Sequence, residues 1–142
     1  MIIPVKIRTF KFPDDYAAVV ELWEQSGPGI QVGRSDTMGE ISKKLGRDPD
    51  LFLVAENRGE IIGTVIGGYD GRRGMIYHLA VNTEFRQRGI GSQLMVSVEN
   101  RLWDKGCLRS YLMIRKENSA AHFYEANGWQ PLEISMFGKD LQ

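Results

Sequence analysis

Between Val81 and Leu94 the chain reads VNTEFRQRGIGSQL, a segment that combines two arginines, two glycines and a serine. The residues that lead into it, Met75 to Val81, have an apolar strand pattern. After Gly89 the apolar residues recur every four positions, which is the spacing of an amphipathic helix. The first turn of a helix leaves backbone N–H groups without partners, and the helix dipole adds positive charge there. This strand-to-helix junction therefore predicts a phosphate site.

The side chains of the junction suit a diphosphate. Gly89 and Gly91 have no Cβ atom, so a pyrophosphate can approach the backbone closely. Arg86 and Arg88 supply permanent cations, and Ser92 supplies a hydroxyl donor. The alternative is a flexible glycine turn with two solvated arginines, because short motifs of this kind also occur by chance.

Two common phosphate-binding motifs do not fit the segment. A Rossmann fingerprint requires a third glycine where Leu94 stands, within a βαβ unit. A P-loop requires the tripeptide Gly-Lys-Ser/Thr, which the sequence does not contain. A nucleotide-binding domain built on either motif is therefore disfavoured.

Strands and helices mix along the chain without strict alternation. Apolar runs predict strands at residues 5–10, 51–56, 61–69, 75–81, 108–114 and 134–137, with 108–114 apolar enough to be buried. Helical spacing predicts helices after residues 13–15, after the cap candidate Asp36, after Gly89 and over residues 118–126. Short turns make the three central strands antiparallel. The pattern predicts one α+β domain over residues 1–142, with a mixed, mostly antiparallel sheet flanked by about four helices.

Composition limits the classes of partner. Eighteen basic residues offset eighteen acidic ones, so the formal net charge is +0, whereas a nucleic-acid binder usually carries a basic excess or stripe. No apolar run approaches the roughly 18 residues that span a bilayer, which predicts no membrane partner. The single cysteine, Cys107, allows no intrachain disulfide and fits a cytoplasmic location. Cys107, His78 and His122 lack metal-ligand spacing, so no metal site is expected.

The junction resembles the acetyl-CoA motif of the GNAT acetyltransferase superfamily, which is Arg/Gln-x-x-Gly-x-Gly/Ala after a strand that ends in valine. Arg86, Gly89 and Gly91 match this motif in register. Thr83 replaces a proline that is frequent in the family, a change confined to the turn. The order of strands and helices is similar to the family order over most of the chain. The sequence is most similar to short single-domain bacterial members, with FLVAE at 52–56 and GGYDG at 67–71.

The resemblance implies that acetyl-CoA is the cosubstrate and that no metal takes part. In the family, the strand before the motif splays from its neighbour and offers main-chain hydrogen bonds to the pantetheine arm and the acetyl carbonyl. Leu79 and Val81 occupy the matching positions. Position by position, the implied cofactor-binding residues are Leu79, Val81, Arg86, Gln87, Arg88, Gly89, Ile90, Gly91, Ser92 and Tyr124.

Near the C-terminus, YEANGW from Tyr124 to Trp129 resembles the family signature Tyr-Glu-x-x-Gly-Phe, with Trp129 in place of phenylalanine. The resemblance implies that Tyr124 is the catalytic acid that protonates the leaving thiolate. A phenol with an unperturbed pKa near ~10 is protonated at neutral pH and can donate as the C–S bond breaks. The alternative is a structural tyrosine with one hydrogen bond. The spacing before Tyr124 is one residue shorter than usual, so either Glu117 takes the family's asparagine position or the helix starts differently, which leaves Asn118 open as a CoA contact.

The sequence leaves the general base open. His78 is attractive because its unperturbed pKa of about 6.5 lies near neutrality. Strand alternation predicts that His78 faces away from Tyr77, Leu79 and Val81, and a structural histidine is an equal alternative. The remaining candidates are a water chain and two carboxylates near the sheet, Glu56 and Glu60.

These observations predict an N-acetyltransferase that moves the acetyl group of acetyl-CoA directly to a primary amine of a small molecule, peptide or protein. A second class is a CoA-binding regulator or sensor of the same fold with little or no turnover, which the unassigned base leaves open. A nucleotide-binding domain outside this family is a third. No recognisable code identifies the acceptor, whose selection we expect from residues 27–36, the second helix and the final strands. Family habit implies a monomer or a homodimer.

Overall fold

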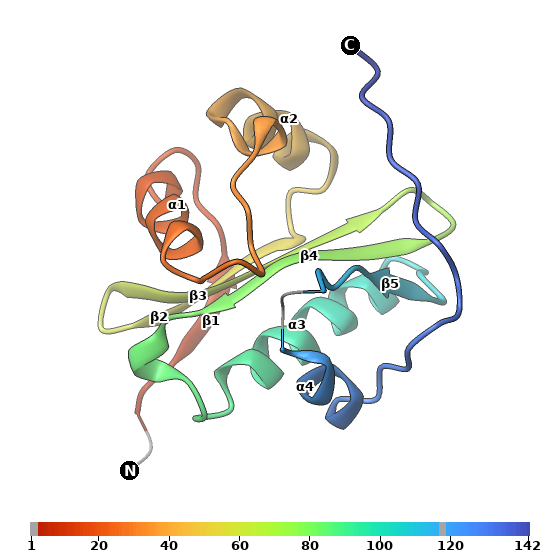
Figure 1. Cartoon of the computed structure of the whole chain (residues 1–142). Helices are drawn as coiled ribbons and strands as arrows, with labels where there is room; N and C mark the ends of the chain where they lie inside the picture. The colour runs from red at the N-terminus through yellow and green to blue at the C-terminus, as the bar shows by residue number, and fades with distance from the viewer. Residues whose placement is uncertain (1–2, 117–118) are drawn as a thin grey trace.

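Five strands form one sheet in the computed structural model, which describes residues 3–116 and 119–142 (Figure 1). In sheet order they are β1 (Lys6–Thr9), β2 (Phe52–Asn57), β3 (Glu60–Tyr69), β4 (Gly74–Val81) and β5 (Ser110–Leu112). The first four strands pair antiparallel, and β5 pairs parallel with β4. The predicted mixed, mostly antiparallel sheet is confirmed.

Two tight turns join the central strands. Between β2 and β3, Arg58 (φ 49°) and Gly59 (φ 83°) both have left-handed backbone, as a two-residue type I′ turn requires. Between β3 and β4, Asp70 Oδ1 accepts the backbone N–H groups of Arg72 and Arg73, both at 2.8 Å. Because both connections are short, β2, β3 and β4 must be neighbours in the sheet.

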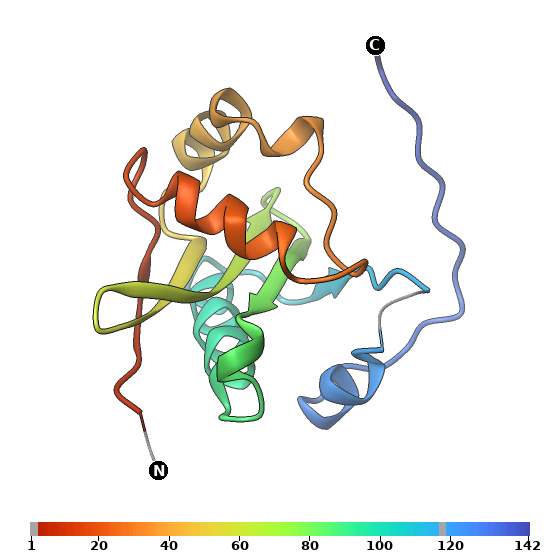
Figure 2. The same cartoon turned by 60° about the vertical axis from the view of Figure 1, so that its left-hand side comes forward.

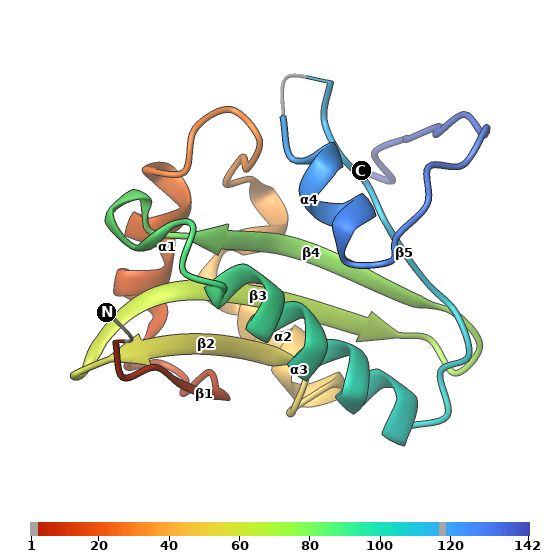
Figure 3. The same ribbon diagram turned by 90° about the horizontal axis from the view of Figure 1, so that it is seen from below.

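Helices cover both faces of the sheet (Figures 1 and 2). α1 (Tyr16–Glu24) and α2 (Met38–Arg47) lie over one face. α3 (Ile90–Asp104) crosses β2, β3 and β4 on the other face, with α4 (Ala121–Ala126) beside it (Figure 3). Two 3₁₀ turns, Arg34–Asp36 and Thr83–Phe85, precede α2 and α3. Within residues 3–116 and 119–142, no helix has both the length and the apolar character needed to cross a membrane.

Alternation along β2 divides the core into two apolar layers. Phe52 and Val54 pack beneath α1 together with Trp23. Leu53, between them in the chain, packs against α3 together with Leu94. All five side chains are fully buried, and each such burial stabilises the fold by about 1.5–3 kcal/mol. β2 is therefore held between the helices on the two faces of the sheet.

The predicted last strand at residues 134–137 is wrong. Phe137 is 93% exposed, and residues 129–142 have no strand pairing. The chain after α4 instead runs as an extended segment beside the molecule (Figure 2). Its end lies near Arg34, whose guanidinium is 3.7 Å from Asp140 Oδ2. The alternating apolar pattern suits a strand, but a strand needs a hydrogen-bonded neighbour, and this segment has none among the described residues.

Two further predictions need correction. The buried strand expected at 108–114 pairs only over Ser110–Leu112, and Leu108 is 82% exposed. β5 is the edge strand of the sheet, so one of its sides lacks a strand partner in the described chain.

The second helix is capped by Thr37 rather than by Asp36, since Thr37 Oγ1 accepts the N–H of Glu40 at 3.2 Å. Asp36 is buried and points to the sheet instead.

Candidate active site

β4 loses its partner on one side partway along its length. Its parallel pairing with β5 covers only Gly74 to Ile76, whereas its antiparallel pairing with β3 continues to Val81. The N–H of Asn82 donates to Ile62 O at 2.8 Å. Because hydrogen bonds alternate along an antiparallel ladder, Val81 directs its own N–H away from β3. The sheet thus opens between β4 and β5, with a main-chain donor at the opening.

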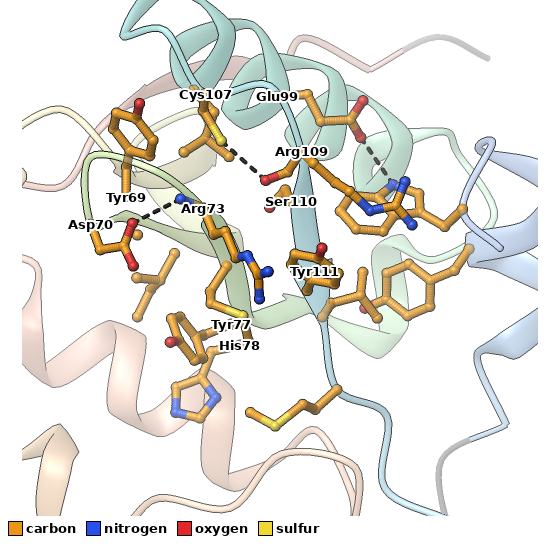
Figure 4. A pocket seen from close by; sticks show the side chains of 18 of the residues that line it. Tyr69, Asp70, Arg73, Tyr77, His78, Glu99, Cys107, Arg109, Ser110 and Tyr111 are labelled. Atoms are coloured by element: carbon orange, nitrogen blue, oxygen red, sulfur yellow. Dashed lines mark hydrogen bonds between the residues drawn. The ribbon is translucent and has the colours of Figure 1, made fainter. Parts of the chain in front are cut away.

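A bulge turns the side chains of Tyr77 and His78 to the same face. The register of β3 against β4 shifts at this point, and His78 has left-handed backbone with φ 48°. The His78 ring packs 4.6 Å from the Trp23 ring of α1, and Tyr77 lies next to it (Figure 4). The prediction that these two residues face opposite sides is wrong, because a bulge adds one residue to a strand and breaks its alternation. Leu79 and Val81 pack in the opposite layer.

A cavity of about 580 Å³ lies at this opening. Nine of the ten residues expected to bind cofactor line it: Leu79, Val81, Arg86, Gln87, Gly89, Ile90, Gly91, Ser92 and Tyr124. Arg88 does not line it; its side chain is exposed, and its guanidinium lies 5.7 Å from the ring centroid of Phe85. Residues 26–30 between α1 and α2 and residues 119–120 before α4 complete the walls. In the sequence, the glycines at positions 27 and 29 predict a loop. Glycines alone do not predict that this loop lines a cavity.

The loop before α3 has a defined shape. Gln87 (φ 62°) and Gly89 (φ 80°) have left-handed backbone, and Gly89 caps the start of α3. Arg86 Nε donates to Val81 O at 3.1 Å, which holds this guanidinium beside the end of β4. The first-turn N–H groups of α3 have no intrahelical partners. Main-chain donors and one arginine therefore gather at one end of the cavity.

Tyr124 reaches the cavity wall from α4. The helix packs close to α3, because a Cβ on Gly91 would lie only 3.1 Å from Phe123 Cζ. Gly128, at φ 89°, ends α4, as the Asn-Gly pair predicts. Burial raises the pKa of Tyr124 to about 12, so the phenol is protonated at neutral pH. Its hydroxyl has no hydrogen bond to any described residue, and the structural alternative for Tyr124 required one.

Tyr124 also lines a larger cavity of about 1820 Å³, part of whose lining is shown in Figure 4. Tyr77 and His78 line this cavity, the neighbouring Leu79 lines the smaller one, and Tyr124 lines both. Further walls come from α2, α3, the ends of β3 and β4, β5 and the segment after α4. Two molecules, one in each cavity, would therefore meet at Tyr124 and the bulge of β4.

His78 is paired with Asp36, a contact that sequence analysis missed. His78 Nε2 lies 3.0 Å from Asp36 Oδ2 and 3.1 Å from Oδ1. The carboxylate also accepts the N–H of Gly33 at 3.0 Å, and the Asp36 carbonyl accepts the hydroxyl of Tyr16 at 2.7 Å. With Nε2 donating to a carboxylate, a neutral imidazole leaves Nδ1 as the proton acceptor. The two residues are 42 positions apart, so no local pattern indicates the pair.

The other candidates for the base lie elsewhere. Glu56 accepts a hydrogen bond from Arg8 Nε at 2.5 Å, which lowers the pKa of Glu56. Neither Glu56 nor Glu60 lines either cavity. Glu117 and Asn118 fall outside the described residues. Within the described part of the chain, no three His, Cys, Asp or Glu side chains are arranged to hold a metal ion.

Comparison with known proteins agrees with this architecture. Residues 48–131 match the family model described as an acetyltransferase (GNAT) domain. An acetyltransferase of Pectobacterium atrosepticum is 42% identical over 138 residues, which are 96% of each chain. Among solved structures, Ard1 of Thermoplasma volcanium has a TM-score of 0.75 and 26% identity, over 87% of this chain and 81% of that one. The PaiA N-acetyltransferase of Thermoplasma acidophilum, in complex with coenzyme A, has a TM-score of 0.80 at 19% identity, over 94% of each chain. With a family model that matches more than half of its residues and a relative of this identity along nearly its whole length, the chain belongs to the GNAT acetyltransferase family.

Proposed function

We propose that the protein binds acetyl-CoA in the smaller cavity and transfers the acetyl group directly to a primary amine held in the larger one. The observation that supports this most is that the two cavities meet at Tyr124. Holding both reactants side by side makes the transfer effectively unimolecular and needs no covalent enzyme intermediate. The proposal takes residues 1–142 as one cytoplasmic acetyltransferase domain, whose acceptor is a small-molecule, peptide or protein amine.

The smaller cavity offers donors that match both parts of the cofactor. The pyrophosphate suits the unpaired N–H groups in the first turn of α3, beside Arg86. The exposed Arg88 adds a second cation outside the cavity wall. The pantetheine arm and the acetyl carbonyl suit the open edge of β4, where we assign main-chain hydrogen bonds to Leu79 and Val81. A main-chain N–H aimed at the acetyl oxygen stabilises the charge that develops on it during transfer.

The larger cavity offers one proton acceptor and one proton donor for the transfer. The acceptor ammonium loses a proton before its nitrogen attacks, and we assign that proton to Nδ1 of His78, whose Nε2 is held by Asp36. The N–C bond then forms and the C–S bond breaks. Tyr124 gives its phenolic proton to the sulfur, so CoA leaves as the thiol; the attacking nitrogen releases its second proton to solvent to give the neutral amide, and solvent reprotonates the tyrosine.

The competing class is a CoA-binding sensor of the same fold. A sensor needs the smaller cavity alone. The second cavity, the His78–Asp36 pair within it and a Tyr124 hydroxyl that bonds to none of the described residues favour the enzyme. A protein that only binds CoA requires neither a second cavity nor a proton acceptor and a proton donor in its wall.

The proposal is tested by following free thiol released from acetyl-CoA in the presence of amino acids, polyamines, amino sugars and a peptide amine. We expect thiol release that depends on an amine and matches the N-acetyl product found by mass spectrometry. Tyr124→Phe should keep its affinity for acetyl-CoA and lose about 100- to 10,000-fold in kcat. Tyr69→Phe, which removes another hydroxyl from the larger cavity, is the matched control. Binding of acetyl-CoA without release by any amine would support the sensor instead.

A further inference from the structure

Most charged side chains around the larger cavity are already paired. The pairs among its lining residues are Lys43–Glu40, Lys44–Asp48, His78–Asp36 and the Trp129 indole with Glu99. Arg47 donates to Tyr69 O at 2.9 Å. Two lining cations, Arg73 and Arg109, have no salt bridge within the described chain. The lining as a whole carries no excess of positive charge, because acidic side chains offset its lysines and arginines; what distinguishes Arg73 and Arg109 is that no described carboxylate pairs with them.

Both unpaired arginines gather at one aromatic ring. The guanidinium carbon of Arg73 lies 5.8 Å from the Tyr111 ring centroid, and that of Arg109 lies 5.4 Å from it (Figure 4). A cation–π contact uses the face of the guanidinium plane and leaves the N–H groups at its edge free to donate. Two guanidinium groups therefore lie near one ring in the wall of the cavity.

Main-chain contacts fix the backbone positions of Arg73 and Arg109 relative to each other. Gly74 N–H donates to Arg109 O at 3.0 Å, which joins the start of β4 to the residue before β5. A Cβ on Gly74 would lie 2.7 Å from Cys107 Sγ, so glycine is what permits this close approach. The nearby Asp70 forms no ion pair with either arginine among the described residues, and its Oδ1 accepts the backbone N–H of Arg73. Backbone hydrogen bonds, first from Arg73, lower the pKa of Asp70.

The arginine pair lies at a fixed distance from the proposed site of transfer. Tyr111 is the register partner of Met75 on β4, which is three residues before His78 in the sequence. At about 3.3 Å per residue, the ring and the histidine are separated by roughly 10 Å along the strand. An acceptor whose amine lies at His78 and Tyr124 can therefore extend to the arginines with a chain of about six atoms.

We propose that Arg73, Arg109 and Tyr111 form a subsite for an anionic group, a carboxylate or a phosphate, at the far end of the amine acceptor. The inference rests on the proposed acetyl transfer and names its substrate class. Guanidinium groups bind planar carboxylate and phosphate oxygens with paired N–H donors. The acceptor is thus an amine with a terminal acid, which distinguishes it from a polyamine or a neutral amino sugar.

The test compares three probes of one chain length in the unreactive complex with CoA, where no acetyl group is present. The probes are 6-aminohexanoate, 6-aminohexyl phosphate and the neutral 6-aminohexanamide, with dissociation constants measured by calorimetry. We expect the two acids to bind at least about ten-fold more tightly than the amide, and the tighter acid identifies the preferred anion. Arg73→Gln and Arg109→Gln should each reduce that preference, and the double variant should remove it.

Lys43→Gln is the matched control, since it removes an exposed cation that is already paired with Glu40 on α2; it should leave the preference unchanged. Stabilisation by CoA confirms that each variant is folded. Equal affinity for the amide and the acids, no measurable binding of any probe, or a preference that survives the double arginine variant would overturn the subsite. Amine-dependent thiol release combined with equal probe affinities would overturn the subsite alone and leave the acetyltransferase proposal standing.

Discussion

Burial of Tyr124 should lower the stability of the fold at alkaline pH. In the folded protein burial raises the pKa of Tyr124 to about 12, whereas a tyrosine in the unfolded chain titrates near ~10. Above pH 10 the unfolded chain releases a proton that the folded chain keeps, so unfolding becomes more favourable as the pH rises. With one pKa unit worth about 1.4 kcal/mol, linkage gives a loss of roughly 0.8 kcal/mol at pH 10.5 and almost none at pH 7.

The assay is urea unfolding of the wild type and of Tyr124→Phe at both pH values. The stability difference between the two proteins should shift in favour of the variant by roughly 0.8 kcal/mol on going from pH 7 to pH 10.5. The other tyrosines are present in both proteins and cancel in this comparison, and Tyr69→Phe serves as the control. A difference that does not change with pH would mean that Tyr124 titrates like a solvated phenol. The argument that burial keeps it protonated as an acid would then be refuted.

Three further predictions concern packing, the base and an ion pair. Gly67→Ala should destabilise the fold by about 1–3 kcal/mol in urea unfolding, because a Cβ there would lie 2.8 Å from Val98 Cγ2; adding Val98→Ala should recover part of the loss. His78→Gln should lower kcat about 100-fold, since glutamine cannot take the proton of the acceptor ammonium; an unchanged kcat would point to another base. Asp15→Asn should cost about 1–3 kcal/mol at pH 7, because it weakens a 2.7 Å contact with Arg8. Burial raises the pKa of Asp15 and the Arg8 hydrogen bond lowers it, with a net decrease from 3.8, so this deficit should shrink as the pH falls below that value; a deficit that persists in acid would contradict the assignment.

Local patterns explain what sequence analysis found. The junction from Val81 to Leu94 is continuous in the chain, and its arginine and glycines are brought to one cavity by a single turn and the start of α3. The hairpin at Arg58-Gly59 depends on a two-residue turn, whose chemistry is also local. Tyr124 was found through a contiguous signature in one short helix.

Features that depend on contacts between distant segments were missed. The bulge at His78 breaks strand alternation, and no nearby glycine or proline marks it. The His78–Asp36 pair joins β4 to the turn before α2. Arg73 and Arg109 meet at one ring only because β5 returns parallel to β4. The expected strand at 134–137 failed for a related reason, since an alternating pattern does not say whether a partner strand is present.

The central claim is that the smaller cavity binds acetyl-CoA, and thermal unfolding with and without this ligand tests it most directly. At about 100 times the dissociation constant, acetyl-CoA and CoA should each stabilise the fold by roughly 2.7 kcal/mol, and ATP and NAD should not. Arg86→Gln, which changes a residue on the cavity wall, should weaken this stabilisation more than Arg88→Gln, which changes a residue two positions away that does not line the cavity. An unchanged melting temperature with both CoA species, or equal stabilisation by ATP, would contradict the account.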